Sequence, residues 1–365
     1  MKILHVITSL QIGGAEKLMV DILPKMRAAG HEVELVCFYG VRTDFYRQLE
    51  AAGVPVHALG MWKNVYNPLY LWRLFRFLRK RDFDVVHAHN YAPQLFCAIL
   101  KKFFRVMLCA CTEHNTSNRR RGWTWYAAVD RRMYAQYDEV VCISDGTEAN
   151  LRKFICDESS KIFTIPNGID VQKIAGARPL AGGLGCESGA KTLMQVARFG
   201  VQKDQDTVLR ALAILPENVH VFFVGDGARR AECEALAERL GVRARAHFLG
   251  VRMDVPELLK SADAVVMSSH WEGFGLAAAE GMAAGKAVVA SDVSGLREVV
   301  GGAGLLFPKG DERALAAAVS KLFADDDFRA RTAEACFRRA GAFDIGKTVS
   351  GYLATYENLL STKNK

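Results

Sequence analysis

The chain has 365 residues, more than one hydrophobic core usually serves, so its length favours two domains of ordinary size. Half of the residues are hydrophobic, 24% are charged and no low-complexity tract interrupts the chain, which excludes an intrinsically disordered protein. The net charge of +8 arises mainly in residues 1–170, where 23 basic residues stand against 17 acidic ones, but no recognisable nucleic-acid-binding motif accompanies the charge.

The first half of the chain alternates short β-branched runs with amphipathic stretches, a pattern that predicts parallel strands joined by helical crossovers. The first run is too short for a signal peptide and leads into a Gly-Gly pair rather than a cleavage site, so we interpret it as a buried strand. No apolar run approaches the roughly 20 residues that a membrane-spanning helix needs. The expected strands are residues 3–8, 32–38, 54–59, 84–88, 106–112, 139–143 and 162–165.

The pattern pauses after Pro166 and resumes after Ala190, which predicts two α/β domains separated by a linker. Further strands are expected at 192–197, 219–224, 246–249, 264–267, 287–291 and 304–307. The amphipathic stretch 345–360 follows the last strand by a long interval, so we expect it to pack back across the domain junction. The predicted division is an N-terminal Rossmann-like domain (1–170), a linker (171–190), a C-terminal Rossmann-like domain (191–344) and a C-terminal helix (345–365).

The nine cysteines are scattered and mostly lie in apolar runs, so we interpret them as reduced core thiols. Cys109 and Cys111 form the only close pair, which we expect to point to opposite faces of a strand and which lacks the spacing of a zinc or redox pair.

Basic residues alternate with aromatic ones in three segments, 71–81, 101–105 and 119–123. Such mixtures suit an anionic membrane surface, although the solvated faces of core helices give the same pattern.

Polar motifs follow several of the expected strands, where open α/β sheets bind their ligands. Gly13 and Gly14 open a helix after the first strand, so a ligand oxygen could approach the backbone closely; a simple tight turn is the alternative. In the second half, Arg198 and Lys203 follow the strand 192–197, and two cations converging beyond a sheet suit a diphosphate. They could equally be ordinary surface cations.

A second polar segment runs from Glu272 to Glu280 after the strand 264–267. Glu272 precedes two glycines and should lie in the loop, whereas Glu280 should lie inside the following helix, which we expect to be largely buried. The start of that helix suits phosphate or sugar oxygens, and a ribose diol or a core ion pair would satisfy Glu280.

Taken together, these residues resemble the retaining glycosyltransferases of the GT-B fold, family 4 (glycosyl transferases group 1). The motifs that carry the resemblance occur in family order along nearly the whole chain: Gly13-Gly14-Ala15-Glu16, His114, Ile165 to Asp170, Arg198 with Lys203, Val224 to Gly227, Phe248 to Gly250, and Glu272 to Gly285.

The resemblance implies an α/β protein of the GT-B fold, with two Rossmann-like parallel-sheet domains facing a central cleft. It implies that Arg198 and Lys203 hold the donor diphosphate, that Glu280 holds the ribose, and that Gly14 approaches the diphosphate. It further implies that Glu272 and the backbone of Gly273, Phe274, Gly275 and Leu276 hold the donor sugar and phosphate. His114 matches the family's histidine beside the transferred sugar. Here Lys203 is followed by Asp204 where the family often has glycine, which places an acid near the expected phosphates.

His87 and His89 lie two residues apart on one face of an extended segment, a spacing that a metal pair could have. Family members commonly have this pair without a metal, so the resemblance implies no metal site and no cofactor other than the nucleotide-sugar co-substrate.

The resemblance therefore implies a metal-independent hexosyltransferase that moves a hexose or N-acetylhexosamine, with retention, from a nucleoside diphosphate sugar to an acceptor hydroxyl. We expect a UDP-sugar donor, a lipid-linked or surface-polysaccharide acceptor, and a cytoplasmic protein that associates peripherally with the inner face of the plasma membrane. Three alternatives stay open: an epimerase of the UDP-N-acetylglucosamine type, a non-catalytic nucleotide-sugar-binding module, and a nicotinamide dehydrogenase, which the absent G-x-G-x-x-G fingerprint disfavours.

Overall fold

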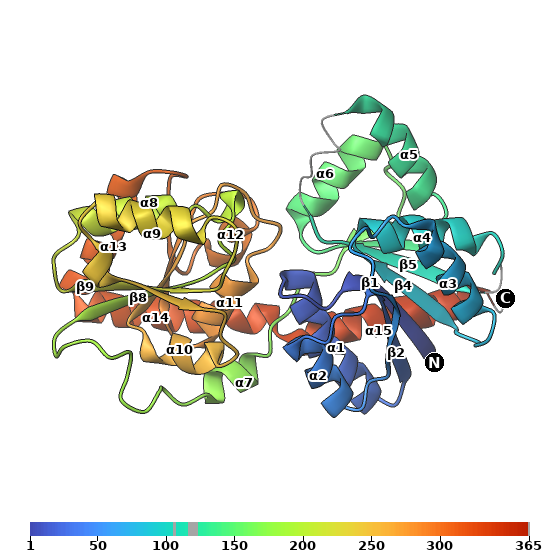
Figure 1. The fold of residues 1–365 in the computed structure, drawn as a ribbon, viewed down its shortest axis with the longest axis horizontal. Helices are drawn as coiled ribbons and strands as arrows, with labels where there is room; N and C mark the ends of the chain where they lie inside the picture. The colour runs from blue at the N-terminus through green and yellow to red at the C-terminus, as the bar shows by residue number, and fades with distance from the viewer. Residues whose placement is uncertain (105–106, 116–122, 364–365) are drawn as a thin grey trace. The chain divides into compact units, whose positions relative to one another are not determined.

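The computed structural model describes residues 1–104, 107–115 and 123–363, and Figure 1 shows its helices and strands. The chain forms two compact units: unit 1 contains Met1–Gly168 and Ile345–Lys365, and unit 2 contains Ile169–Asp344. Each unit is a parallel sheet with helices on both faces, so the α/β class and the two Rossmann-like sheets are confirmed.

Unit 1 has a seven-stranded sheet in the order β3-β2-β1-β4-β5-β6-β7, in which every pairing is parallel. Its central strands are buried along nearly their whole length, as expected where a sheet is covered on both faces, although they include several polar residues. The strands are β1 (Lys2–Ser9), β2 (Glu32–Tyr39), β3 (Val56–Gly60), β4 (Val85–His89), β5 (Leu108–Glu113), β6 (Glu139–Cys142) and β7 (Ile162–Thr164). The helices are α1 (Gly14–Ala28), α2 (Asp44–Ala51), α3 (Pro68–Leu78), α4 (Tyr91–Lys101), α5 (Thr124–Tyr134), α6 (Asp145–Ile155) and α15 (Ile345–Lys363).

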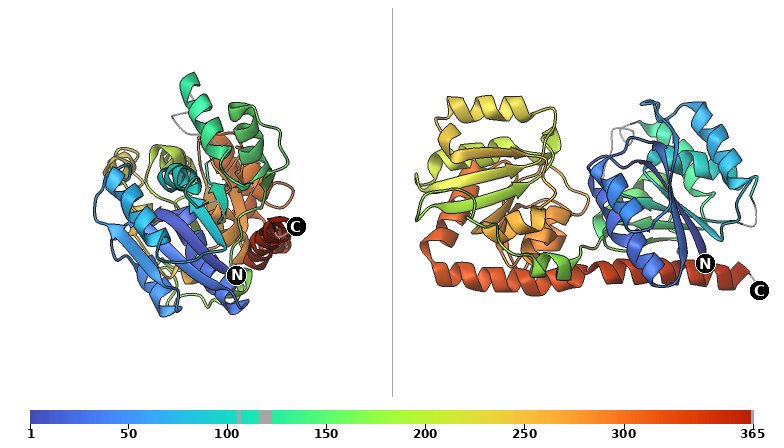
Figure 2. Two further views of the ribbon diagram at one scale, coloured as in Figure 1. Left: turned by 90° about the vertical axis from the view of Figure 1, so that its right-hand side faces the viewer. Right: turned by 60° about the horizontal axis from the view of Figure 1, so that its bottom comes forward.

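Two hydrophobic clusters cover the two faces of this sheet. Residues of α3 and α4 belong to one cluster, and residues of α1, α2 and α15 belong to the other. Helix α15 contributes Ile345, Val349, Tyr352 and Tyr356, which recur at helical spacing and are all buried. In Figure 2 α15 is the long red helix, and it packs against α1.

Unit 2 repeats the arrangement with a six-stranded parallel sheet in the order β10-β9-β8-β11-β12-β13. Its strands are β8 (Lys191–Val196), β9 (Val219–Val224), β10 (Ala246–Gly250), β11 (Ala264–Met267), β12 (Ala287–Ser291) and β13 (Leu305–Phe307). Its helices are α7 (Val171–Gly176), α8 (Gln205–Ile214), α9 (Arg230–Arg239), α10 (Val255–Ser261), α11 (Leu276–Ala283), α12 (Leu296–Val300), α13 (Glu312–Ala324) and α14 (Asp326–Ala340), with short 3-10 turns η2 (Val201–Lys203), η3 (Arg243–Arg245) and η4 (Gly341–Phe343).

The boundary between the units differs from the one that the sequence suggested. The Ile169 N–H donates to the Phe343 carbonyl at 2.9 Å, and Ile169 also forms a parallel bridge with Asp344, so unit 2 begins at residue 169. The expected linker 171–190 belongs to unit 2 and begins with α7, which packs on α10 and α11. On the unit 1 side, a Cβ on Gly168 would come within 2.6 Å of the Ile345 Cα, so only glycine fits there.

The cysteines are all free among the described residues, and seven of the nine are buried; Cys156 is exposed and Cys186 is half-buried. Cys109 and Cys111 do not point to opposite faces. They pack in the same core cluster, because residues two apart on a strand share a face.

Among the residues that the structure describes, no helix is both long enough and apolar enough to cross a bilayer.

Candidate functional site

The predicted site residues divide between the two units. Gly13, Gly14 and His114 belong to unit 1, and the remaining residues, from Arg198 to Glu280, belong to unit 2. In each sheet the strand order reverses once, between β1 and β4 in unit 1 and between β8 and β11 in unit 2. Ligands of open α/β sheets bind beyond the carboxyl ends of the strands at such a reversal, and the predicted residues of both units follow these strands or their neighbours.

In unit 2, hydrogen bonds join the loop after β8 to the loop after β11. The Ser268 hydroxyl donates to the Asp204 carbonyl at 2.8 Å and accepts from the Gln195 side-chain amide at 2.9 Å. The His270 N–H donates to the Gln202 carbonyl at 2.8 Å. Gln195 and Ser268 are fully buried, and no sequence pattern marks them, because isolated polar residues in or beside apolar strands are common.

The structure brings Lys203 and Glu272 together as an ion pair. The Lys203 ammonium bonds to one carboxylate oxygen of Glu272, which the Ser269 hydroxyl also approaches at 3.5 Å. The two charged side chains are only 20% and 12% exposed, so water screens the pair less than it would at the surface. The acid that follows Lys203 in the sequence, Asp204, is buried and accepts a 2.8 Å hydrogen bond from the Thr207 hydroxyl. The carboxylate paired with Lys203 is therefore that of Glu272.

Arg198 lies two residues beyond β8, and its side chain is exposed. It makes no ion pair with any other residue that the structure describes. Its backbone is fixed from both sides: the Gln205 amide donates to the Arg198 carbonyl at 3.2 Å, and the next residue, Phe199, is buried. Gly225, with φ +134°, lets the neighbouring loop approach, since a Cβ there would lie 2.2 Å from the Ala197 carbonyl oxygen. A rigid loop thus presents an exposed guanidinium.

The segment from Gly273 to Leu276 leads into helix α11. Phe274 is buried and anchors the loop, while Gly275 adopts φ +103° at the N-cap and offers no capping side chain. The first backbone N–H groups of α11 therefore have no side-chain cap, and an anion could take this place.

Helix α11 packs closely on its sheet because its residues are small. A Cβ on Gly281 would come within 2.9 Å of Val265 of β11, and Ala278, Ala279 and Met282 are buried. Glu280 is half-buried on this helix, in keeping with the largely buried helix that the sequence predicted.

In unit 1, Gly13 and Gly14 lie at the start of α1, next to β1. Gly13 is the N-cap residue in an extended conformation and offers no capping side chain, and Gly14 is the exposed first residue of the helix. The carboxylate of Glu16, in the first turn of α1, lies against Gly13.

His114 follows β5, two strands away from β1 in the sheet. Its Nε2 lies 3.0 Å from Nδ1 of His89, whereas its Nδ1 is covered and has no hydrogen-bond partner among the described residues. Burial lowers the pKa of His114 to about 4, so the imidazole is neutral at pH 7.

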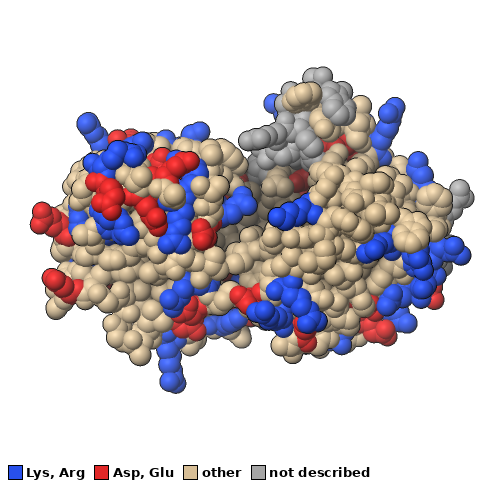
Figure 3. Space-filling view, viewed as in Figure 1, with Lys and Arg blue, Asp and Glu red and all other residues tan. Residues whose placement is uncertain are grey.

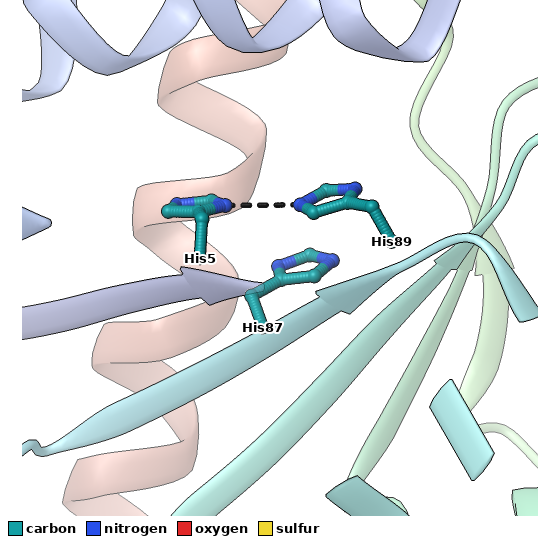
Figure 4. Close-up of side chains that lie close together, drawn as sticks. All are labelled: His5, His87 and His89. Carbon is teal, nitrogen blue, oxygen red and sulfur yellow. Dashed lines mark hydrogen bonds between the residues drawn. The ribbon is translucent and has the colours of Figure 1, made fainter. Parts of the chain in front are cut away.

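His87 and His89 lie beside a third histidine that the sequence did not single out, His5 of β1. The three rings stack within 14° of parallel, and Figure 4 shows them one beside another above β1 and β4. One nitrogen from each lies within 4.8 Å of the others, close enough for a metal ion. The rings of His87 and His89, however, lie face to face with their planes 5° apart, so their lone pairs lie in parallel planes rather than converging on one point.

Hydrogen bonds also occupy several of these nitrogens. His87 bonds to the Tyr356 hydroxyl through Nδ1 and to the Thr112 hydroxyl at 2.7 Å through Nε2. His5 Nδ1 lies 3.0 Å from His89 Nε2. This geometry favours a hydrogen-bonded stack over a metal centre.

Two family profiles match the chain: Glycosyltransferase Family 4 over residues 12–173, and Glycosyl transferases group 1 over residues 183–339. Among curated proteins, the phosphatidyl-myo-inositol mannosyltransferase of Mycolicibacterium smegmatis is 27% identical over 364 residues, covering 95% of this chain and 90% of its own. The lipopolysaccharide core biosynthesis glycosyltransferase LpsD of Rhizobium meliloti is 27% identical over 337 residues, covering 91% and 90%.

Solved structures agree on the fold. The Anabaena protein HepE, in complex with UDP and glucose, superimposes with a TM-score of 0.86 at 23% identity, covering 98% of this chain and 99% of its own. WaaG, a glycosyltransferase involved in lipopolysaccharide biosynthesis, superimposes with a TM-score of 0.75 at 20% identity, covering 96% and 98%.

Two Rossmann-like sheets with polar motifs beyond their central strands, and these structural neighbours, define the GT-B fold class. The chain belongs to the group 1 glycosyltransferases, also described as glycosyltransferase family 4.

Proposed function

We propose that the chain transfers a hexose or N-acetylhexosamine from a nucleoside diphosphate sugar, UDP-sugar in the first place, to a hydroxyl of a lipid-linked or surface-polysaccharide precursor. The observation that carries the proposal is the charged end of the unit 2 sheet, where Arg198, the Lys203–Glu272 pair and the uncapped start of α11 follow β8 and β11. The names of the relatives and the UDP bound to HepE support the same substrate classes.

The proposed chemistry needs negative charge to be stabilised on the departing diphosphate. Arg198 presents a guanidinium that no described carboxylate neutralises, and a guanidinium forms paired hydrogen bonds with phosphate oxygens. The N–H groups of α11 add a partial positive charge. We assign Glu280 to the ribose hydroxyls, and Glu272 with the backbone from Gly273 to Leu276 to the donor sugar. In unit 1 we assign His114 to the donor sugar and Gly14 to the diphosphate.

Transfer is proposed to proceed with retention and without a divalent metal, because cationic side chains and helix N–H groups can stabilise the leaving group in place of a metal. The acceptor would attack the anomeric carbon on the face from which the diphosphate departs, and a phosphate oxygen would take the acceptor's proton. No covalent glycosyl-enzyme forms in this scheme.

A lipid acceptor is supported by the surface of unit 1 around α3. Trp72 and Leu69 are 52% and 46% exposed, and the Arg76 guanidinium lies over the Trp72 ring at 4.8 Å. Figure 3 shows Lys and Arg gathered over this region of unit 1. Basic groups beside exposed aromatic rings suit anionic headgroups, and we propose peripheral binding there, at the inner face of the plasma membrane. Arg105 and the basic residues 119–121, which the sequence also suggested, lie outside the described residues.

The donor experiment measures release of nucleoside diphosphate from a panel of UDP- and GDP-hexoses with EDTA present, with and without a membrane-lipid extract. Release from one donor that rises with the extract, with the anomeric configuration retained in the product, is the expected result. Conversion of a sugar nucleotide to its epimer, or binding without turnover, would overturn the proposal in favour of the epimerase or the silent module.

Vesicle flotation tests the membrane part separately. We expect binding to anionic phosphatidylglycerol vesicles at low salt and none to neutral phosphatidylcholine vesicles. Trp72→Ala should weaken the binding, whereas Phe337→Ala, which removes an exposed aromatic ring from unit 2, should not. Equal weakening by both variants would contradict a site on α3.

A further inference from the structure

Three histidines of unit 1 form a continuous hydrogen-bonded chain across neighbouring strands. His5 Nδ1 lies 3.0 Å from His89 Nε2, and His89 Nδ1 lies 3.0 Å from His114 Nε2. The first contact is the dashed line in Figure 4. The two end nitrogens, Nε2 of His5 and Nδ1 of His114, are buried without a partner among the described residues.

All three imidazoles are neutral at pH 7. Burial lowers the pKa of His5 to about 3 and that of His114 to about 4, and it lowers the pKa of His89 well below the ordinary value. A neutral imidazole carries one N–H and one bare nitrogen, so each contact between two rings needs a donor on one side and an acceptor on the other.

Only two concerted arrangements satisfy both contacts. In the first, His5 donates from Nδ1 to His89, which donates from Nδ1 to His114, leaving a proton on Nδ1 of His114. In the second, every proton sits on Nε2, and the unpartnered N–H is that of His5.

The two arrangements differ in where they leave an unpartnered donor. His5 is fully buried in the sheet, so a free N–H there could never find an acceptor and would destabilise the fold. The Nδ1 of His114 is also covered, but His114 lies one residue beyond the end of β5, where ligands of α/β sheets bind, so a ligand is the acceptor that this end of the chain can meet. The first arrangement is therefore favoured.

We infer that His5 and His89 fix His114 as its Nδ1–H tautomer, so that His114 donates a hydrogen bond to an oxygen atom of the sugar nucleotide. The identity of that ligand rests on the proposed function; the tautomer does not. His5 and His89 are then positioning residues that act through His114. His87 stacks on the same rings, but it bonds to Thr112 and Tyr356 and takes no part in the hydrogen bonds that join His5, His89 and His114.

The first experiment requires no substrate. Long-range proton–nitrogen correlation spectra of the full chain, labelled with ¹⁵N-histidine, distinguish protonated from bare ring nitrogens, and the spectrum of His114→Gln assigns the His114 signals. We expect the proton on Nδ1 of His114, His89 and His5 alike. A proton on Nε2 of His114, or rapid exchange between the two tautomers, would overturn the inference.

Matched variants then separate positioning from simple packing. His5→Leu removes the donor at the end of the chain, whereas His87→Leu removes an equally buried histidine with two hydrogen bonds that lies outside it. We expect His5→Leu to release the His114 tautomer and to lower kcat/KM for the donor about tenfold, the worth of one hydrogen bond. His87→Leu should lower stability but leave the His114 tautomer unchanged.

Loss of the His114 tautomer in both variants, or in neither, would contradict a positioning role for His5. If His5→Leu does not fold, the wild-type spectrum alone decides the inference. If no donor is turned over, the proposed function fails while the tautomer measurement still stands; if a donor is turned over but His114 carries its proton on Nε2, only this inference fails.

Discussion

The two units have the same strand order around their central strands, but the polar side chains near those strands are uncharged in unit 1 and charged in unit 2. In unit 1 the polar groups next to β1 and β4 are buried histidines that burial keeps neutral. In unit 2 the groups next to β8 and β11 are an exposed arginine and a half-buried ion pair. One topology thus supports buried, uncharged imidazoles in one unit and partly or fully exposed charged groups in the other.

The largest effect should come from removing the exposed guanidinium of unit 2. Arg198→Ala should lower kcat by about 100- to 1000-fold, the loss expected when one donor to developing negative charge is removed. Steady-state release of nucleoside diphosphate measures it. The control is Arg210→Ala, which removes another exposed arginine from unit 2, on helix α8. Similar losses in the two variants would contradict a specific role for Arg198.

Acid should separate the two units by stability. An unfolded histidine binds its proton near pH 6.5, whereas burial lowers the pKa of His5 to about 3 and that of His114 to about 4. Between those values the unfolded state binds more protons, so unit 1 loses stability as the pH falls below about 6.5. Between its folded and unfolded pKa values, each such histidine lowers the free energy of unfolding by up to about 1.4 kcal/mol for every pH unit of acidification. Above about pH 6.5 its contribution no longer changes with pH.

Unit 2 should be less sensitive, because among its described histidines only half-buried His247 has a clearly lowered pKa. Hydrogen exchange at pH 7 and pH 5, followed peptide by peptide, tests this. The strands of unit 1 should lose protection first at pH 5. Earlier opening of unit 2 would contradict the assignment of acid sensitivity to the buried histidines.

Glu139 of β6 should have the opposite effect on the pH dependence of stability in unit 1, because this group destabilises the folded state as the pH rises. One of its carboxylate oxygens is buried without a partner among the described residues, and burial, with Asp138 adding to it, raises its pKa to about 7. The folded state then binds the extra proton between about pH 4.5 and 7, so this group costs stability as the pH rises through that range.

Glu139→Gln should therefore stabilise unit 1 at pH 8 by about 1 kcal/mol, after allowance for partial solvent screening, and should change little at pH 4. Thermal unfolding at the two pH values measures the difference. Glu158→Gln, at a carboxylate that is 84% exposed, serves as the control and should have no effect. A destabilising Glu139→Gln at pH 8 would show that the carboxylate has a favourable partner.

The sequence was informative about the strands and about the candidate site residues that follow their ends. Continuous apolar runs predicted the strands, and Arg198, Lys203 and Glu272 were recognisable because charged residues and glycines directly follow such runs. His5, Gln195 and Ser268 were not, because a single polar residue in an apolar strand carries no pattern.

Contacts between residues far apart in the sequence could not be predicted either. His87 bonds to Tyr356, 269 residues away, and no local periodicity predicts such a pair. The motif from Ile165 to Asp170 resembled the family pattern, but the structure assigns it a structural role: the Thr348 hydroxyl donates to the Pro166 carbonyl at 2.9 Å, and Asp170 caps α7. These hydrogen bonds fix the backbone of the segment in which the chain passes from unit 1 to unit 2.

The smallest expected effect concerns the ion pair that distinguishes unit 2. Glu272→Gln keeps the size of the side chain but removes the charge that compensates Lys203. Because a free ammonium attracts a diphosphate more strongly than a paired one, UDP should bind up to about fivefold more tightly, the scale of one partly screened ion pair. Turnover should fall, since the carboxylate is assigned to the donor sugar. Isothermal titration with UDP, beside Glu334→Gln at an exposed pair on α14, measures the change. Weaker UDP binding would mean that Glu272 itself contacts the nucleotide. The carboxylate would then bind UDP together with the cationic groups of unit 2, instead of only pairing with Lys203 until the nucleotide binds.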